Sequence, residues 1–123
     1  IEAGLTEATG KINFDSNNSV LLPKAVYEKS GAKNYHIYNQ YIVRAEKRDE
    51  LRDFLTKNEI FTEIYYPVPF HLQECFADLG HKKGDFPISE FSADYSIALP
   101  IYPELSDEQL VYVVETFKKF FNQ

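Results

Sequence analysis

The clearest hydrophobic pattern in the sequence lies near its C-terminus, where apolar side chains recur at intervals of three and four residues. The positions are Leu110, Val113, Val114, Phe117 and Phe121. This spacing places them on one face of a helix, where they can pack on a core. Ser106 precedes the pattern, and Gln109 lies three residues after Ser106, which is the arrangement of a capping box. The sequence therefore predicts a C-terminal helix that begins after Ser106.

A strand–helix–strand pattern occupies the middle of the chain. Residues 35–44 are rich in aromatic and β-branched side chains and predict a strand. Residues 46–58 predict a helix, because their large apolar side chains are spaced i, i+3, i+4. Those side chains are Leu51, Phe54 and Leu55. Residues 61–66 predict a second strand, which ends at Pro67 because proline cannot donate to a strand ladder.

Weaker signals predict the remaining elements. Apolar runs at residues 12–14 and 20–22 flank a polar cluster and indicate either a hairpin or a loop. The other elements expected are a short helix at residues 72–79 that ends at Gly80, a helix from Pro87 to about Tyr95, and an edge strand at residues 97–101. Together the patterns predict an α+β domain, with a small, mostly antiparallel sheet and helices packed on one face.

The overall composition is that of one folded domain with an acidic balance. The 123 residues are 44% hydrophobic and 15% aromatic, and the formal net charge is -6. A nucleic-acid-binding protein would normally carry a basic patch, and no apolar stretch approaches the roughly 18 residues that a membrane helix needs. These features argue against nucleic-acid and membrane partners. The single cysteine, Cys75, cannot form an internal disulfide, so a reducing, cytoplasmic location is expected.

The N-terminal residues predict that the chain is a piece of a longer protein. The sequence begins with Ile1 and contains no methionine. Residues 1–5 resemble the last turn of a helix that ends at a glycine. We therefore expect two parts, a helix remnant with an irregular connection in residues 1–19 and a small domain in residues 20–123.

Sequence motifs that carry catalysis or bind a cofactor are absent. The sequence contains no G-x-G-x-x-G, no P-loop and no G-x-S-x-G elbow. His71 and Cys75 lie four residues apart and could share a helix face, but a structural zinc site needs four ligands. From the residues alone we predict no catalytic, cofactor-binding or metal-binding side chain.

Residues 64–71 are the strongest candidate for a binding site. They combine the hydroxyls of Tyr65 and Tyr66 with His71, on a backbone stiffened by two prolines. Rigid aromatic side chains with polar tips can orient a ligand at little cost in conformational entropy. The alternative is that the two tyrosines cover the edge of the sheet and Phe70 fills the core.

Two further positions carry side chains that could serve a ligand. His36 lies within the predicted strand, where a half-buried, hydrogen-bonded role is the alternative to a functional one. Lys82 and Lys83 precede Gly84 in a basic turn. There they could meet a phosphate as point charges, or they could simply be solvated.

Six segments occur in the order found in one family of enzymes. They are Tyr35 to Arg44, Arg48 to Leu51, Thr62 to Gln73, Phe76 to Gly80, Gly84 to Pro87 and Leu99 to Leu105. Together they resemble the DegT/DnrJ/EryC1/StrS aminotransferases, also called sugar aminotransferases, over roughly residues 20–121. Tyr65 and Tyr66 match a pair in the family's substrate-facing loop that is often His-Tyr, so Tyr65 stands in place of the histidine.

The resemblance implies that the chain is the C-terminal small domain of a fold type I pyridoxal-phosphate enzyme. The family transfers an amino group, usually from glutamate, to a keto-sugar attached to a nucleoside diphosphate, and its members are usually homodimers. The family's catalytic lysine lies upstream in the large domain. This chain is therefore expected to pack on its own large domain, to bind no pyridoxal phosphate covalently and to be inactive alone. The substrate-binding residues implied by position are Tyr65, Tyr66, His71, Lys82 and His36.

A second hypothesis is a stand-alone α+β ligand-binding or regulatory module without catalysis. The two hypotheses differ in the surface that they require. A severed enzyme domain would expose a large apolar patch where the large domain packs, whereas a stand-alone module would not need one.

Overall fold

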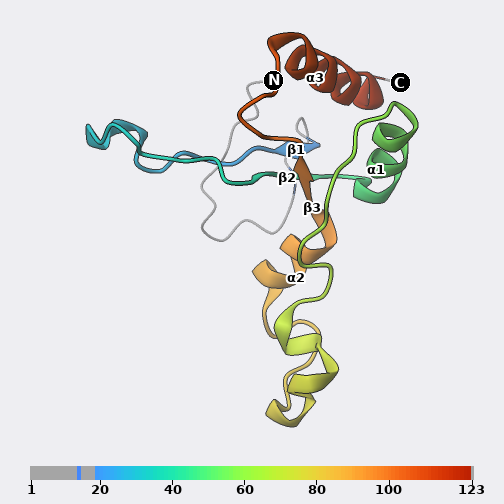
Figure 1. Cartoon of the computed structure of the whole chain (residues 1–123). Helices are drawn as coiled ribbons and strands as arrows, with labels where there is room; N and C mark the ends of the chain where they lie inside the picture. The colour runs from blue at the N-terminus through green and yellow to red at the C-terminus, as the bar shows by residue number, and fades with distance from the viewer. Residues whose placement is uncertain (1–13, 15–18, 123) are drawn as a thin grey trace.

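A three-stranded antiparallel sheet stands at the centre of the molecule in the computed structural model (Figure 1), which describes Phe14 and residues 19–122. The strands, in spatial order, are β1 (Val20–Leu21), β2 (Tyr41–Ala45) and β3 (Ser96–Leu99). Ala98 of β3 pairs with Ile42 of β2 and, on its other edge, makes a single antiparallel bridge to Glu63. The small antiparallel sheet expected from the sequence is therefore confirmed.

Six helical segments surround or extend from the sheet within the described residues. They are η1 (Glu28–Ser30), α1 (Arg48–Lys57), η2 (Phe70–Leu72), η3 (Glu74–Leu79), α2 (Pro87–Tyr95) and α3 (Asp107–Phe121), where η marks a 3-10 helix. None of these helices is long and apolar enough to cross a lipid bilayer.

The main core lies between the sheet and the helices α1 and α3. Its side chains with no exposed surface are Val43, Ala45, Leu51, Leu55 and Ile97. Because successive strand residues point to opposite faces, Val43 and Ala45 of β2 both face this core. Val113 and Phe117 of α3 complete it. Leu110 and Val114, which the helical pattern places on the buried face, are instead 50% and 41% exposed.

The helix α2 lies on the other face of the sheet. Arg44 of β2 points away from the main core, and its guanidinium lies 5.8 Å from the centroid of the Phe91 ring on α2. Phe91 is buried, and its ring also packs on Phe14 and Tyr95, with centroid distances of 5.3 Å and 4.7 Å. The expectation that all helices share one face therefore does not hold for α2, because the second face of β2 also has an apolar partner.

Arg48 connects α1 to the junction between α2 and β3. Its Nη1 donates to the carbonyl oxygens of Ala93 and Ser96, at 2.9 Å and 3.2 Å. The side chain is only 11% exposed. The Arg48 guanidinium therefore satisfies carbonyl acceptors at the end of α2. Its positive charge there is also favoured by the helix dipole.

Local sequence signals identified the helix ends correctly. Ser106 accepts from the Gln109 backbone N–H at 3.2 Å, and the Gln109 side chain accepts from the Ser106 N–H at 3.0 Å, which confirms the capping box of α3. Pro87 is the first residue of α2, as predicted. Gly80 ends η3 with a φ of 72°, a left-handed conformation that glycine adopts readily.

Four of the predicted elements are shorter or different in the structure. Residues 35–40 are not part of a strand, because Tyr38 has a φ of 46° and the chain turns there before β2 begins. Residues 61–66 make only the bridge at Glu63. In place of the helix expected at residues 72–79, the chain forms the 3-10 segment η3 from Glu74 to Leu79, preceded by η2, which ends at Leu72. The predicted edge strand is β3, which ends before Pro100.

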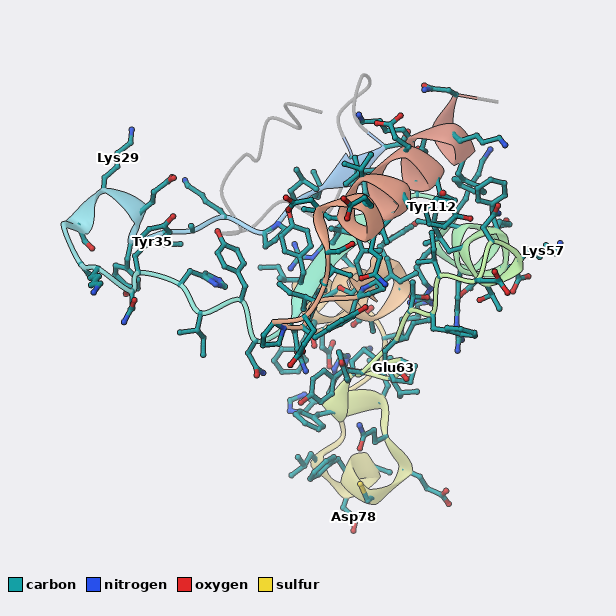
Figure 2. All side chains as sticks on the ribbon, turned by 45° about the horizontal axis from the view of Figure 1, so that its top comes forward. Lys29, Tyr35, Lys57, Glu63, Asp78 and Tyr112 are labelled. Carbon is teal, nitrogen blue, oxygen red and sulfur yellow. The ribbon has the colours of Figure 1, made fainter. Side chains whose placement is uncertain are left out.

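Two segments project from the sheet (Figure 1). One is the arm between β1 and β2, coloured blue to cyan, and the other is the projection of residues 65–86, coloured green to yellow. Figure 2 shows Lys29 and Tyr35 in the arm and Asp78 near the tip of the projection. The hairpin or loop expected at residues 12–22 and the division at residue 19 lie mostly outside the described residues.

Candidate functional site

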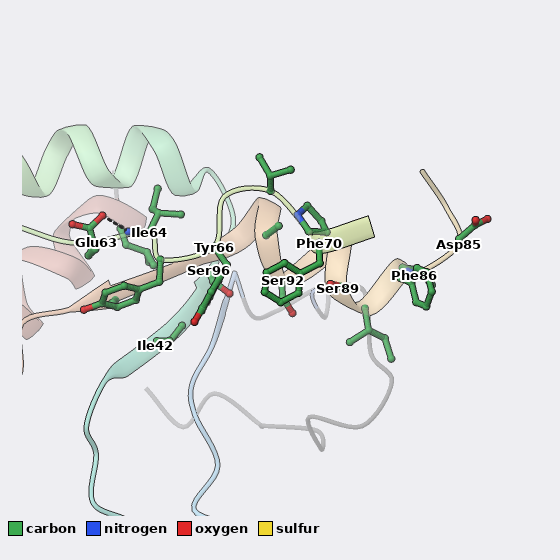
Figure 3. A pocket seen from close by; sticks show the side chains of 18 residues that line it. Ile42, Glu63, Ile64, Tyr66, Phe70, Asp85, Phe86, Ser89, Ser92 and Ser96 are labelled. Atoms are coloured by element: carbon green, nitrogen blue, oxygen red, sulfur yellow. Dashed lines mark hydrogen bonds between the residues drawn. The ribbon is translucent and has the colours of Figure 1, made fainter. Parts of the chain in front are cut away.

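A pocket of about 650 Å³ lies where the projection meets the sheet. Its lining comes from the segment Glu63–Phe70, the turn Asp85–Phe86, the helix α2 and the strands β2 and β3. Figure 3 shows the lining side chains that these segments contribute. The residues that form the pocket are thus brought together from three separate parts of the sequence, namely β2, residues 63–70 and residues 85–98.

The loop after Glu63 supplies an aromatic wall. Tyr65 and Tyr66, both predicted from the sequence as ligand-facing, line the pocket and are 47% and 69% exposed. Phe70 also lines it, and its ring centroid lies 6.3 Å from that of Tyr66 in an edge-to-face arrangement. Phe70 is 65% exposed and does not fill the core. The reading in which Phe70 is a core residue is therefore wrong.

The helix α2 and the first residue of β3 supply a row of hydroxyl groups that sequence reasoning missed. Ser89, Ser92 and Ser96 all line the pocket, and Figure 3 shows them along one side of it. Ser89 and Ser92 are three residues apart in α2, which places them on one face of a helix. That spacing was visible in the sequence, but only the folded chain shows that this face lines a pocket.

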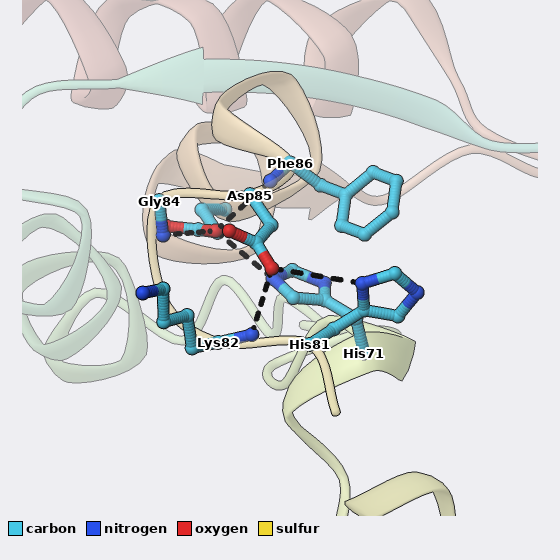
Figure 4. Close-up of polar contacts among 7 residues, drawn as sticks. His71, His81, Lys82, Gly84, Asp85 and Phe86 are labelled. Atoms are coloured by element: carbon cyan, nitrogen blue, oxygen red, sulfur yellow. Dashed lines mark hydrogen bonds and ion pairs between the residues drawn. The ribbon is translucent and has the colours of Figure 1, made fainter. Parts of the chain in front are cut away.

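His71 directly follows Phe70 in the sequence, and its ring contacts a carboxylate beside the turn of Gly84 and Asp85 (Figure 4). Its Nε2 is 2.9 Å from Oε1 of Glu90, and the two side chains are 7% and 12% exposed. His71 does not line the pocket. The structure thus gives His71 a protein partner, while its predicted contact with substrate stays a prediction.

Glu90 also accepts hydrogen bonds from the backbone. The Gly84 N–H donates to both carboxylate oxygens, at 2.8 Å and 3.0 Å, and the Phe86 N–H donates to Oε1 at 3.4 Å. Burial raises the pKa of Glu90, but the hydrogen bonds from Gly84, His71 and Phe86 together outweigh it, so its pKa lies below the ordinary value. The carboxylate is therefore ionised near neutral pH.

The basic turn predicted at residues 82–85 is present beside this cluster. The Lys82 backbone N–H donates to Oδ2 of Asp85 at 3.0 Å, and the Asp85 N–H donates to the Lys82 carbonyl at 3.1 Å. Nδ1 of His81 lies 3.6 Å from the same Asp85 oxygen. Lys82 is exposed and does not line the pocket, although Asp85 does. Its predicted contact with a phosphate stays a prediction.

His36 lies in the arm and not at the pocket. Its Nδ1 accepts from the Tyr38 backbone N–H at 2.9 Å, and the two rings lie 4.1 Å apart between centroids. This contact fits the left-handed turn at Tyr38. The structure does not bring His36 together with Tyr65 and Tyr66.

The described residues supply no lysine to the pocket lining. Within residues 14 and 19–122, no group of three His, Cys, Asp or Glu side chains is placed to hold a metal ion. The groups that the pocket offers for binding and orienting a ligand are aromatic faces, tyrosine and serine hydroxyls, and the carboxylates of Glu63 and Asp85.

Comparison with known proteins gives a consistent result. The family model of the DegT/DnrJ/EryC1/StrS aminotransferases matches residues 13–118. A pleiotropic regulatory protein of Geobacillus stearothermophilus is 44% identical over 117 residues, which are 95% of this chain and 28% of that protein. A dTDP-3-amino-3,4,6-trideoxy-alpha-D-glucose transaminase of Streptomyces venezuelae is 34% identical over 84 residues, which are 68% of this chain and 22% of that protein. The chain spans about a quarter of the length of these relatives.

Solved structures show the same likeness in fold. The structure of S. venezuelae DesV in complex with a ketimine intermediate matches with a TM-score of 0.65 at 34% identity, over 68% of this chain and 23% of that one. A DegT DnrJ EryC1 StrS aminotransferase from Brucella abortus matches with a TM-score of 0.62 at 30% identity, over 68% of this chain and 22% of that one.

Proposed function

We propose that this chain, which belongs to the DegT/DnrJ/EryC1/StrS aminotransferase family, is the C-terminal small domain of a pyridoxal-phosphate-dependent aminotransferase that acts on a nucleotide-linked keto-sugar. The names of similar proteins support this substrate class. One is a transaminase of a dTDP-linked amino sugar, and another is a 3-aminotransferase of a UDP-linked sugar. The order of the matching sequence segments supports the placement in the parent.

The pocket beside Tyr65 and Tyr66 is the observation that carries this proposal. It forms where the family's substrate-facing loop is expected, and its lining combines aromatic side chains with serine hydroxyls. A sugar ring has apolar C–H faces and a rim of hydroxyls, so it can pack on tyrosine rings and bond to groups such as Ser92. We propose that Tyr65 and Tyr66 orient the sugar part of the substrate.

The diphosphate part of such a substrate needs positive charge. Lys82 and Lys83 are exposed in the turn next to Asp85, which lines the pocket. We propose that Lys82 meets the diphosphate as a point charge, which needs no fixed bidentate geometry. His36 lies in the arm, and we propose no role for it in this pocket.

Pyridoxal phosphate would serve as the electron sink that makes amino transfer possible. A lysine that holds it must be desolvated or otherwise activated. The described lysines do not fit that role, since none lines the pocket and nearly all are exposed. We propose that the cofactor and its lysine belong to the large domain, and that the residues of this chain bind and orient the sugar nucleotide.

An exposed apolar surface on α3 supports a large domain as partner. Leu110, Val111 and Val114 are 50%, 59% and 41% exposed on this one helix. A contiguous apolar surface of this kind is typical of a protein interface. As part of this family function, we also propose that glutamate is the amino donor, that the parent protein is a homodimer and that it is cytoplasmic.

The test uses the protein expressed from the complete gene. We expect it to bind pyridoxal phosphate, to absorb in the near-ultraviolet and visible range, and to lose that absorbance on treatment with borohydride. Peptide mapping should then find the label on a lysine outside residues 1–123. A protein that stays colourless when reconstituted with pyridoxal phosphate contradicts the aminotransferase proposal.

A regulatory role is the second candidate, because the relative that is 44% identical over 95% of this chain is called a pleiotropic regulatory protein. The same reconstitution separates the two, since a purely regulatory protein needs no cofactor. In that case the pocket beside Tyr65 and Tyr66 is where a ligand should be sought.

A further inference from the structure

We propose that Glu90 is a positioning residue that sets the shape of the pocket by holding two of its walls against the first turn of α2. The identity of the ligand rests on the proposed function, whereas the positioning of the walls does not. Neither Glu90 nor this role follows from the sequence patterns, because its partners lie up to 19 residues away.

The contacts of Glu90 join three segments. Its carboxylate accepts from Nε2 of His71 in η2, from the Gly84 N–H in the turn, and from the Phe86 N–H just before α2. An ionised carboxylate carries no proton, so Nε2 of His71 must be the donor. Figure 4 shows the three partners His71, Gly84 and Phe86 close to one another. Gly84 has a φ of 98°, a left-handed conformation that suits glycine and lets its N–H reach the carboxylate.

These contacts bear directly on the pocket lining. Phe70 precedes His71, and Phe86 packs on the His71 ring with 4.8 Å between centroids. Both phenylalanines line the pocket. Ser89, which adjoins Glu90 in α2, lines it as well. Glu90 therefore stands directly behind the junction of the aromatic wall, the turn and the hydroxyl row.

The projection has little else to fix its position. No apolar residue between Tyr65 and Phe86 is buried, so apolar packing contributes weakly to where the loop and the turn lie. Hydrogen bonds to an ionised group are about twice as strong as neutral ones, and they are strongest where water is largely excluded. With His71 and Glu90 mostly buried, this cluster is the best-placed polar anchor of the projection.

Loss of the Glu90 contacts should change the pocket without unfolding the domain. The core between the sheet and the helices α1 and α3 contains neither Glu90 nor His71. Loss of the Glu90 charge should therefore release the loop and the turn while the sheet stays folded. A pocket with mobile walls would bind its ligand less tightly, because binding must then order them.

The test compares the chain with its Glu90→Gln variant by nuclear magnetic resonance, with Glu74→Gln as the matched control, since Glu74 is exposed in η3. We expect the Gly84 and Phe86 amides of Glu90→Gln to exchange at least about tenfold faster and the contact between the His71 and Phe86 rings to be lost. Amides of Val43 and Ile97 should keep their protection. Glu74→Gln should change none of these.

Two results would overturn the proposal. In one, the Gly84 and Phe86 amides of Glu90→Gln stay as protected as in the unaltered chain. In the other, the Val43 and Ile97 amides lose protection equally, which would make Glu90 a general stabilising residue. His71→Gln tests the same cluster from its other side, and its effect should not add to that of Glu90→Gln.

The functional readout uses the protein from the complete gene. We expect Glu90→Gln to raise KM for a nucleotide keto-sugar about tenfold, with KM for the amino donor unchanged. Equal changes in both constants would contradict a role in the sugar pocket. If the protein lacks aminotransferase activity altogether while the resonance results hold, the proposed function fails and the positioning role of Glu90 stands.

Discussion

The core beside α1 and α3 and the projection of residues 65–86 are held in place by different interactions. In the core, Val43, Leu51, Leu55 and Ile97 have no exposed surface. In the projection no apolar residue is buried, and the best-defined contacts are the polar ones around Glu90. The first region resembles the interior of any small domain, whereas the second depends on a few charged and backbone groups.

This difference separates stability from recognition in one short chain. Burial of apolar side chains fixes the sheet and therefore the position of β2 and β3, which line the inner side of the pocket. The outer walls belong to the projection, where sequence and shape can vary without loss of the core. Binding residues are often found on such loops, held by a rigid scaffold.

The largest expected effect is the loss of a core side chain. Leu55→Ala removes a fully buried side chain and should lower the free energy of unfolding by about 2–5 kcal/mol, because it leaves a cavity. Urea unfolding followed by circular dichroism measures this. Leu110→Ala is the control, since Leu110 is 50% exposed and should cost less than about 0.5 kcal/mol. Equal costs would contradict the assigned core.

The second effect concerns the link between α1 and α2. Arg48→Met keeps much of the side-chain volume but leaves the carbonyls of Ala93 and Ser96 without their donor. We expect a loss of about 1.5–3 kcal/mol in the free energy of unfolding, the range for hydrogen bonds to a charged group. Arg52→Met, at an exposed position of the same helix, should change stability far less. Similar losses in both variants would show that the Arg48 contacts add nothing.

A smaller effect is expected at the start of α3. Ser106→Ala removes the side chain that accepts from Gln109 and should cost about 1 kcal/mol. Ser106→Asp retains an acceptor at the same place and should restore most of the loss. Thermal unfolding of the unaltered chain and of the two variants gives the order of their stabilities. An alanine variant as stable as the aspartate variant would contradict the capping role.

The smallest effect is the acid dependence that Glu90 contributes. Its folded pKa lies below the ordinary value of 4.5, so its contribution to stability is fully present above that pH and is lost as the pH falls through the lowered folded pKa. The charged or titratable side chains around it are His71, His81, Lys82 and Asp85. The stability difference between the unaltered chain and Glu90→Gln should shrink as the pH falls below about 4.5. A difference that stays constant on acidification would contradict this.

The sequence predicted those parts of the fold that depend on neighbouring residues. The capping box at Ser106, the helix start at Pro87 and the stop at Gly80 are local signals, and all three are confirmed. The strand expected at residues 35–44 is half wrong, because its aromatic and β-branched composition gave no sign of the left-handed residue Tyr38. Propensity in strands depends on pairing partners, which a local pattern does not contain.

The candidate site was predicted in part for the same reason. Tyr65 and Tyr66 stood out as rigid aromatics between prolines, and both line the pocket. The serine row and Glu90 were missed, since their importance depends on contacts between α2 and distant segments. His36 and Lys82 were selected by residue type, and the structure places neither in the pocket lining.

The measurement that tests the central claim most directly is a pair of half-reaction rates in the protein from the complete gene. Tyr66→Ala is compared with Tyr27→Ala, a control at an equally exposed position in the arm, where Tyr27 is 66% exposed and Tyr66 69%. The account predicts that Tyr66→Ala slows amino transfer to a nucleotide keto-sugar at least about tenfold, while transfer from the amino donor is unchanged. Equal rates for the two variants in both halves would contradict the claim that this pocket receives the sugar nucleotide.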